Sequence, residues 1–509
     1  MNSSNERPNF SKISSKDLDE RYVYTAKVDQ VIQTSGPTLF KLYDGHGILT
    51  AKAFLSPGER AHPEINSDDV IEVEVLIKSY NDELEANIQE IKKVDSVEFK
   101  EKIDKILDDK SQPQVNDFSI NSKVYNEMKE EFKGAAYEIR KAIYQSRPII
   151  IRHHNDCDGY SAAIALERAI LPLIEEHHGK RGVWKYYQRS PSSSPYYDYG
   201  DSIRDLTRLL KDSERFDDEK PLVILADLGS SLENELSLEL LSVYGVDFVV
   251  IDHHLGDFKE TDRLSKVHIN PHKKGGSSNL TAGMLCSEVA RFINSDSKNP
   301  LLPVLSGIGD RSNCNEFDLY LEKLREETDF SMSTLRKYVH VVDFQAYHLR
   351  FIESRKMMDD LMGRDYKKQK EMVDLIYPKI NKKVKKSYDA AKHFLVSEKI
   401  GNVNLFRLKV NETLHRGYPK AGQIVGMIKD DLEKENKNVV MIGEFDDMFI
   451  FRASDDSEFD VHEVMESIKK NVSESLVEGG GHKKAGTIKF LSASKDKVFT
   501  ELKKYLLTI

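Results

Sequence analysis

The amino-acid sequence predicts a multidomain α/β protein. Its 509 residues are enough for two to four domains. Short β-rich runs separated by turn residues fill residues 21–95, which predicts a small β-barrel. Apolar runs then alternate with helical segments from Pro148 to Ile251, a pattern typical of a mostly parallel sheet flanked by helices. The alternation returns within residues 398–509, so we expect a second α/β domain there.

These patterns divide the chain into six segments. We expect, in order, a disordered tail (1–20), the barrel (21–95), a charged and irregular linker (96–118), the first α/β domain (119–315), a helical connector (316–397) and the second α/β domain (398–509). The connector carries no cluster of residues typical of catalysis, which favours a spacer or docking role.

Composition narrows the class of protein. Hydrophobic residues make up 39% of the chain and charged residues 31%, as in soluble proteins with several cores. No apolar stretch approaches the roughly 20 residues of a membrane span, and the polar start lacks the apolar core of a secretory signal. The three cysteines show no CxxC spacing, which argues against disulfides or structural zinc and favours the cytoplasm. A net charge of −10 argues against coating nucleic acid by bulk electrostatics, but not against a local basic groove.

The barrel segment is expected to be an OB-fold, which commonly binds single-stranded nucleic acid. We predict five strands, at Tyr22–Thr34, Thr38–Leu42, Ile48–Phe54, Val70–Ser79 and Leu84–Lys93. A stacking and phosphate-binding face is expected from Tyr22, Tyr24, Phe40, Lys41, Tyr43 and Lys52. The alternative is that most of these aromatic rings belong to the barrel core.

Acids and histidines follow apolar runs at four places in the first α/β domain. The clusters are His154-Asn155-Asp156-Cys157-Asp158-Gly159, Ala226-Asp227-Leu228-Gly229, Asp252-His253-His254 and Gly309-Asp310-Arg311. We interpret each preceding run as a buried strand. In open α/β sheets, ligands bind beyond the carboxyl ends of the strands. Packing does not require charged groups at these ends, whereas divalent cations do, so the clusters predict a metal site.

The first cluster has the spacing of a shared face. His154, Asp156 and Asp158 lie at i, i+2 and i+4, which share one side of an extended segment. This mixture of imidazole and carboxylates suits Mn²⁺ or Mg²⁺ better than structural Zn²⁺. The alternative is that one aspartate caps the helix expected near Tyr160, but two aspartates and a histidine exceed what a cap requires.

The second and third clusters predict different roles for neighbouring residues. We expect Asp227 to bridge two ions, with an ordinary turn residue as the alternative. Adjacent side chains on a strand point to opposite faces. We therefore expect His253 to bind metal and His254 to contact the substrate phosphate or transfer a proton. Asp252 is expected to accept a hydrogen bond from a histidine and orient it.

The remaining candidates lie at the fourth cluster and near the C-terminus. Asp310 is expected to complete the second metal site, with a turn or cap as the alternative. The glycine run Gly479-Gly480-Gly481 exposes backbone N–H groups that can cradle an anion, and His482 can donate to a phosphate oxygen. Arg452 can reach the same anion, with a surface arginine as the alternative. The stretch 190–199 is expected to be a polar loop, either ordinary or in contact with substrate.

These residues together resemble a known family. His154-x-Asp156-x-Asp158-Gly159, Asp227, Asp252-His253-His254 and Asp310 resemble motifs I to IV of the DHH phosphoesterase superfamily, and Gly479-Gly480-Gly481-His482 resembles the signature of its DHHA1 subfamily. The resemblance covers 140–315 and 398–509 and is strongest to archaeal RecJ-like single-strand nucleases. An OB-like barrel before the catalytic core and the connector 316–397 depart from the bacterial pattern.

The resemblance implies a fold, a cofactor and a site. The implied fold is an N-terminal OB-like barrel, a DHH domain, a helical connector and a C-terminal DHHA1 α/β domain. It implies two Mn²⁺ (or Mg²⁺) ions in the cleft between the α/β domains. The implied metal ligands are His154, Asp156, Asp158, Asp227, His253 and Asp310, and the implied substrate contacts are His254, Arg452 and His482. From the residues themselves we expect Asp227, Asp252 and His254 to be catalytic, and Gly480 and Gly481 to bind substrate together with His482.

The expected function is therefore a metal-dependent phosphodiesterase, an exonuclease that hydrolyses single-stranded DNA or RNA by a two-metal mechanism. Two alternatives stay open. One is a phosphodiesterase or phosphatase for nanoRNA, cyclic dinucleotides or a nucleoside bisphosphate, and the barrel argues against it because a dinucleotide needs no extra strand-binding module. The other is a binding subunit of a replication complex, and the complete acid set argues against it, although a replication partner is compatible with catalysis.

Overall fold

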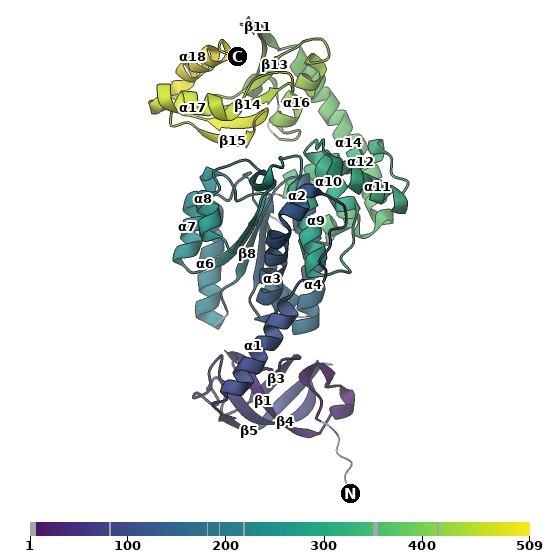
Figure 1. Cartoon of the computed structure of the whole chain (residues 1–509), viewed down its shortest axis with the longest axis vertical. Coiled ribbons are helices and arrows are strands. Elements are labelled where there is room, and N and C mark those ends of the chain that lie inside the picture. The colour runs from purple at the N-terminus through teal and green to yellow at the C-terminus, as the bar shows by residue number, and fades with distance from the viewer. Residues whose placement is uncertain are drawn as a thin grey trace.

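The computed structural model describes residues 7–80, 83–180, 182–192, 194–216, 219–349, 355–414 and 417–509. Figure 1 shows the barrel at one end of the long axis, the first α/β domain in the middle and the second α/β domain at the other end. This arrangement confirms the predicted multidomain α/β fold. None of the helices formed by the described residues combines the length and apolar character that crossing a bilayer requires.

The barrel consists of the five predicted strands. They close in the order β1-β2-β3-β5-β4, with bounds β1 Arg21–Gln33, β2 Thr38–Tyr43, β3 Ile48–Ala53, β4 Val70–Tyr80 and β5 Glu83–Lys93. Side chains on β1 alternate between the core and the outside, as a strand with one buried face requires. Residues 1–6 of the predicted tail lie outside the described residues, and within residues 7–20 Phe10 is buried and packs edge-on against Tyr24 of β1.

The predicted binding face of the barrel is wrong for three of its aromatic rings, because Tyr24, Phe40 and Tyr43 are buried. Tyr24 and Phe40 are core residues, as the alternative proposed. Tyr43 is also buried, and its ring meets that of His177 in the middle domain with centroids 5.7 Å apart. Lys41 Nζ donates to the hydroxyl of Tyr186, 3.1 Å away. This side of the barrel is thus a contact with the middle domain rather than an open surface.

The predicted irregular linker is instead mostly a helix, α1 (Val97–Ser111). Ser96 caps it by accepting from the backbone N–H of Phe99 at 3.2 Å. Ile103 and Leu107 pack with Tyr43 of the barrel. The many charged residues around these widely spaced apolar positions hid the helical pattern in the sequence.

The middle domain is built on a parallel sheet, as predicted, and this sheet has five strands. Its order is β10-β9-β8-β6-β7, with bounds β6 Ile149–His154, β7 Tyr187–Ser192, β8 Leu222–Ala226, β9 Asp247–Ile251 and β10 Val267–Ile269. Both faces are covered, which explains the continuous apolar runs. One face carries α3 (Lys129–Tyr144), α4 (Cys157–His178) and α9 (Ala282–Ile293), and the other carries α6 (Tyr199–Phe216) and α7 (Glu235–Val243).

Two short segments of this domain differ from the prediction. The stretch expected to be a loop from Ser190 begins inside β7, whose polar residues concealed a buried edge strand. The apolar run before Asp310 is not a strand but helix α10 (Leu301–Gly309). Periodicity alone does not separate a short buried helix from a buried strand.

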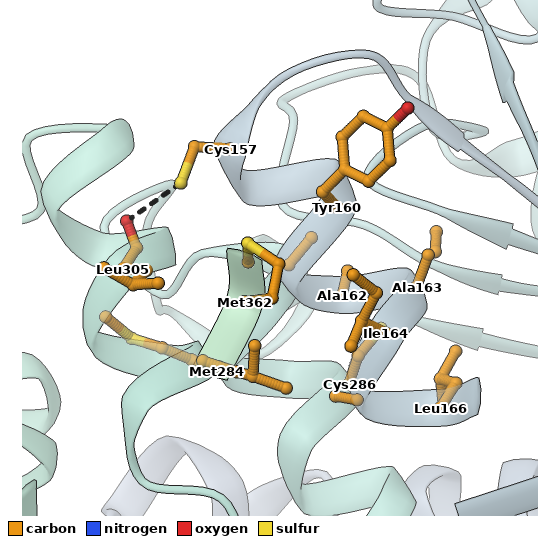
Figure 2. Packing of buried hydrophobic residues seen from close by; sticks show 14 of the residues in the cluster. Cys157, Tyr160, Ala162, Ala163, Ile164, Leu166, Met284, Cys286, Leu305 and Met362 are labelled. Atoms are coloured by element: carbon orange, nitrogen blue, oxygen red, sulfur yellow. Dashed lines mark hydrogen bonds between the residues drawn. The ribbon is translucent and has the colours of Figure 1, made fainter. Parts of the chain in front are cut away.

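The start of α4 is fixed by close packing against two other helices. Figure 2 shows side chains of Met284 and Cys286 from α9, and of Leu305 from α10, gathered around α4. Cys157 Sγ lies 3.6 Å from the carbonyl oxygen of Leu305. Small residues of α4 such as Ala162 let α9 approach closely. The acidic residues near this end of α4 are therefore held on a rigid support.

The connector is helical, as predicted. It contains α11 (Asn315–Glu327), α12 (Met332–Leu349), α13 (Arg355–Asp359) and α14 (Tyr366–Lys392). Buried residues of α12 and α14 belong to the same core as α4 and α9. The long helix α14 then leads into the second α/β domain (Figure 1).

The C-terminal domain is a six-stranded mixed sheet with helices on both faces. Its order is β11-β12-β13-β14-β16-β15, with bounds β11 Val396–Ile400, β12 Val403–Lys409, β13 Val439–Glu444, β14 Met448–Ala453, β15 Glu478–His482 and β16 Ala485–Lys489. Helix α16 (Ala421–Leu432) joins the central core, whereas α17 (Val461–Asn471) and α18 (Lys495–Leu506) cover the other face. The predicted α/β architecture of this domain is confirmed.

Candidate active site

The structure brings the predicted acids and histidines together between the middle and C-terminal domains. His154 ends β6, and Asp227 and His253 follow β8 and β9. Asp310 caps the C-terminus of α10, and His482 arrives at the end of β15. The residues linked by contacts under 4 Å in this cluster are His154, Asp156, Asp158, Asp227, Asp252, His253, His254, Asp310 and His482.

The first group of donors forms around His154. Its Nδ1 lies 2.7 Å from Asp156 Oδ2 and 3.6 Å from Asp227 Oδ2. Asp156 Oδ1 accepts from the backbone N–H of Gly159 at 3.0 Å and thereby caps α4. The cap alternative therefore applies to one oxygen of Asp156, while the other faces His154. Asp158 lies in the first turn of α4, so the predicted extended spacing is wrong for this residue.

The second group of donors surrounds His253. Its Nε2 lies 3.3 Å from Asp227 Oδ1, 3.4 Å from Asp310 Oδ2 and 3.5 Å from Asp158 Oδ2. Its Nδ1 lies 2.7 Å from the carbonyl oxygen of Ser278, to which it donates. The neutral ring then presents a lone pair at Nε2 to three carboxylates, and only a proton or a cation makes this arrangement favourable.

Asp227 is common to both groups. Oδ2 faces His154 and Oδ1 faces His253. Both oxygens are buried, and neither has a hydrogen-bond partner among the described residues. Its backbone lies in the left-handed region with φ of 61°, a strained conformation that aims the side chain between the groups. Burying an ionised carboxylate without partners is costly, so these oxygens fit a bridge between two cations.

The negative charges of this cluster raise the pKa values of both a histidine and a carboxyl group. Burial lowers the pKa of His154, but Asp156 and Asp227 outweigh this effect and raise it to about 10. Burial and the charges of Asp227 and Asp310 raise the pKa of Asp158 well above its usual value. Both shifts express an excess of buried negative charge, which bound protons or cations neutralise.

Asp252 and His254 form a separate pair beside the two groups of candidate metal ligands. Asp252 Oδ2 accepts from the backbone N–H of Ser230 at 2.9 Å, and Oδ1 lies 2.8 Å from His254 Nδ1. Burial lowers the pKa of His254, but Asp252 outweighs it and raises the pKa. This is the contact expected of a carboxylate that orients a histidine. It leaves His254 Nε2 for another partner.

The glycine run is a strand and not an open loop. Gly479, Gly480 and Gly481 pair with β16 within β15, which lies at the sheet edge. A Cβ at Gly481 would lie 2.7 Å from the carbonyl oxygen of Ala485, and φ there is 121°. At Gly480 a Cβ would meet nothing within 4 Å. The hairpin thus holds His482 in place, with Nε2 3.8 Å from Asp310 Oδ2 and its ring stacked on that of His254.

Arg452 does not join the cluster but lines an adjoining cavity of about 1190 Å³, which Asp156 also lines. Burial and then the nearby guanidinium of Arg311 lower the pKa of Arg452 to about 10. A Cβ at Gly422 of α16 would lie 3.2 Å from Arg452 Nη2, so this glycine provides space for the guanidinium. The basic side chains lining the cavity are Arg311, Arg336, His340, Lys420 and Arg452.

Sequence reasoning missed Asp343 of α12. Its Oδ1 accepts from the backbone N–H of Cys157 at 3.0 Å, beside Asp156. Burial raises its pKa to about 7, against the opposing charge of Lys420. No motif surrounds Asp343, so no signal marked it. Arg311 was within reach of the prediction, because it directly follows Asp310 in the fourth cluster.

Comparison with known proteins finds a matching family and a relative of this chain. The family described as "DHH family, N-terminal domain" matches residues 148–308. An uncharacterized protein of Methanocaldococcus jannaschii is 31% identical over 507 residues, with 93% of this chain and 67% of that protein covered.

One solved structure resembles most of the chain. A structure described as the DHH domain of a member of a family of ribosomal proteins superposes with a TM-score of 0.77 at 33% identity, covering 81% of this chain and 98% of that chain. A crystal structure of exonuclease RecJ bound to manganese gives a TM-score of 0.48 at 14% identity, covering 74% and 94%. A likeness as weak as the second says nothing about the chemistry of the present chain.

Proposed function

Because the chain belongs to the DHH family of phosphoesterases, we propose that it is a metal-dependent exonuclease that hydrolyses single-stranded DNA or RNA. The observation that carries this proposal is the carboxylate of Asp227, whose two oxygens face separate groups of donors. Two-metal sites hold their ions about 3.5–4 Å apart, a spacing that a shared carboxylate can bridge.

We assign the donors to two divalent cations. His154, Asp156 and Asp227 would hold one ion, and the second would lie among Asp227, His253, Asp158 and Asp310. Carboxylate oxygens with one imidazole in each group suit Mn²⁺ or Mg²⁺. When bound, such a pair of cations polarises the phosphoryl group and lowers the pKa of a water molecule.

The protein's own groups then stabilise the developing charge. His254, held at Nδ1 by Asp252, can donate from Nε2 to a phosphate oxygen or move a proton there. His482 stacks on His254 and reaches the same region from the C-terminal domain. Arg452 adds a positive charge in the adjoining cavity. Preorganised donors of this kind contribute most in a site shielded from water.

The adjoining space supports a strand over a dinucleotide as substrate. Its volume of about 1190 Å³ exceeds the roughly 300–1,000 Å³ of typical small-molecule pockets. The barrel contacts the far end of the 22-residue helix α4, about 33 Å from its start at 1.5 Å per residue. If the barrel binds nucleic acid, it therefore contacts only substrates that are long enough to reach it. A partner in a replication or repair complex is compatible with this function.

Asp227→Ala tests the proposal. With Mn²⁺ and end-labelled single strands of several lengths, the wild-type protein should release short products and the variant should lose at least about 1,000-fold in kcat, since a shared metal ligand is removed. Asp389→Ala, at an exposed position of α14, is the matched control and should behave as wild type. Normal degradation by Asp227→Ala would refute the proposal. Cleavage confined to dinucleotides would instead identify the small-substrate enzyme.

A further inference from the structure

We propose that helix α12 of the connector forms one wall of the substrate path, and that Arg336 binds a phosphate of the strand a few nucleotides from the bond that is cut. The inference rests on the proposed function and names the residue that favours strands over dinucleotides. The sequence offered only a spacer or docking role for this segment.

One face of α12 is turned toward the cavity. Arg336, His340 and Asp343 lie at i, i+4 and i+7, the spacing of neighbours on one side of a helix. All three line the cavity, together with Met332 and Val339. A helix whose role was only to space two domains would not need to present this mixture of charged and imidazole groups to an open cavity.

Asp343 fixes where this face begins relative to the active site. It accepts from the backbone N–H of Cys157, the residue after the candidate ligand Asp156. Arg336 lies seven residues earlier on the same helix, which is about 10 Å along the axis at 1.5 Å per residue. Phosphates of a stacked strand are roughly 3.4 Å apart along its axis. Arg336 is thus placed about three phosphates away from the cluster.

The charge of Arg336 is available to a ligand. Its side chain is exposed and forms no ion pair or hydrogen bond with any residue that the structure describes. Arg311, in the same cavity, differs because its guanidinium pairs with Asp430 at 2.9 Å. A guanidinium suits phosphate oxygens because its N–H groups form a planar fork. A dinucleotide is too short to reach Arg336 from the metal site, whereas a longer strand reaches it.

The experiment compares substrate lengths in wild type and Arg336→Ala. For single strands of five or more nucleotides with Mn²⁺, KM should rise about 10-fold with kcat unchanged, and dinucleotide kinetics should not change. Loss of one phosphate contact should also make the salt dependence of kcat/KM shallower by about 0.7 in log–log slope. Arg336→Lys should recover part of the lost affinity. Lys337→Ala is the control, since Lys337 is exposed on the same helix and lies over the ring of Tyr377.

The outcomes separate the two proposals. If wild type degrades long strands and Arg336→Ala does so with unchanged KM, the role of α12 is refuted while the proposed function stands. An equal loss on dinucleotides and long strands also refutes it, because the residue would then not act by length. If wild type degrades neither substrate, or dinucleotides alone, the strand-exonuclease proposal fails before any variant is compared, and the inference fails with it.

Discussion

A histidine lies at each end of helix α4, and the charged groups around the two histidines are opposite in sign. At its start, carboxylates raise the pKa of His154 to about 10 against the effect of burial. At its far end, where the barrel contacts the domain, burial and then Lys110 and Lys41 lower the pKa of His177 to about 3. His177 meets the aromatic rings of Tyr43 and Tyr144 there. Burial is therefore common to both ends, and only the acid-rich end is suited to cations and chemistry.

The largest effect that tests this contrast concerns the pair at the active end. His254→Ala should lower kcat about 100-fold, because it removes the imidazole that Asp252 orients toward the phosphate. This is the usual contribution of a positioned acid or base. Mn²⁺ affinity should stay within about 3-fold of wild type, measured by calorimetry, since His254 is not assigned to either ion. His393→Ala at an exposed position is the control. A loss of Mn²⁺ binding would instead make His254 a ligand, as its proximity to Asp227 allows.

A smaller effect is expected at the barrel end. An unfolded histidine titrates near pH ~6.5, and the folded pKa of His177 is lower, so protons favour the unfolded chain. Its stability contribution is complete above pH ~6.5 and is lost as the pH falls toward 3. As the pH falls from 6.5 to 5, the unfolding free energy of wild type should therefore decrease by about 2 kcal/mol more than that of His177→Phe.

Denaturant unfolding at both pH values measures this difference, and turnover at pH 7.5 should not change. His46→Phe makes the same chemical change at an exposed barrel position and should follow wild type. Equal pH sensitivity of His177→Phe and wild type would mean that His177 is not held neutral at the interface.

The parallel sheet and its acidic edge could be predicted because both rest on local patterns. Strands buried on two faces read as continuous apolar runs, and β8 and β9 each end directly before their functional residue. Asp310 was placed correctly for the wrong reason, because α10 is a helix whose C-terminus reaches the same edge. The pattern marked the charged residue but not the type of element that carries it.

The remaining features depend on contacts between distant segments. Tyr43 was expected on an open face, yet the middle domain covers it. The sequence also did not show that the glycine run forms an edge strand, because that depends on its pairing with β16. Asp343 and Arg336 lie on a helix without a motif, and only its packing beside α4 places them near the site. No local pattern encodes which face of a connector helix meets a cavity.

Anomalous diffraction from crystals soaked in Mn²⁺ tests the central claim most directly. We expect two manganese peaks on either side of the Asp227 carboxylate, one beside His154 and Asp156 and the other beside His253, Asp158 and Asp310. A single peak, or peaks that leave Asp227 without manganese, would contradict the account.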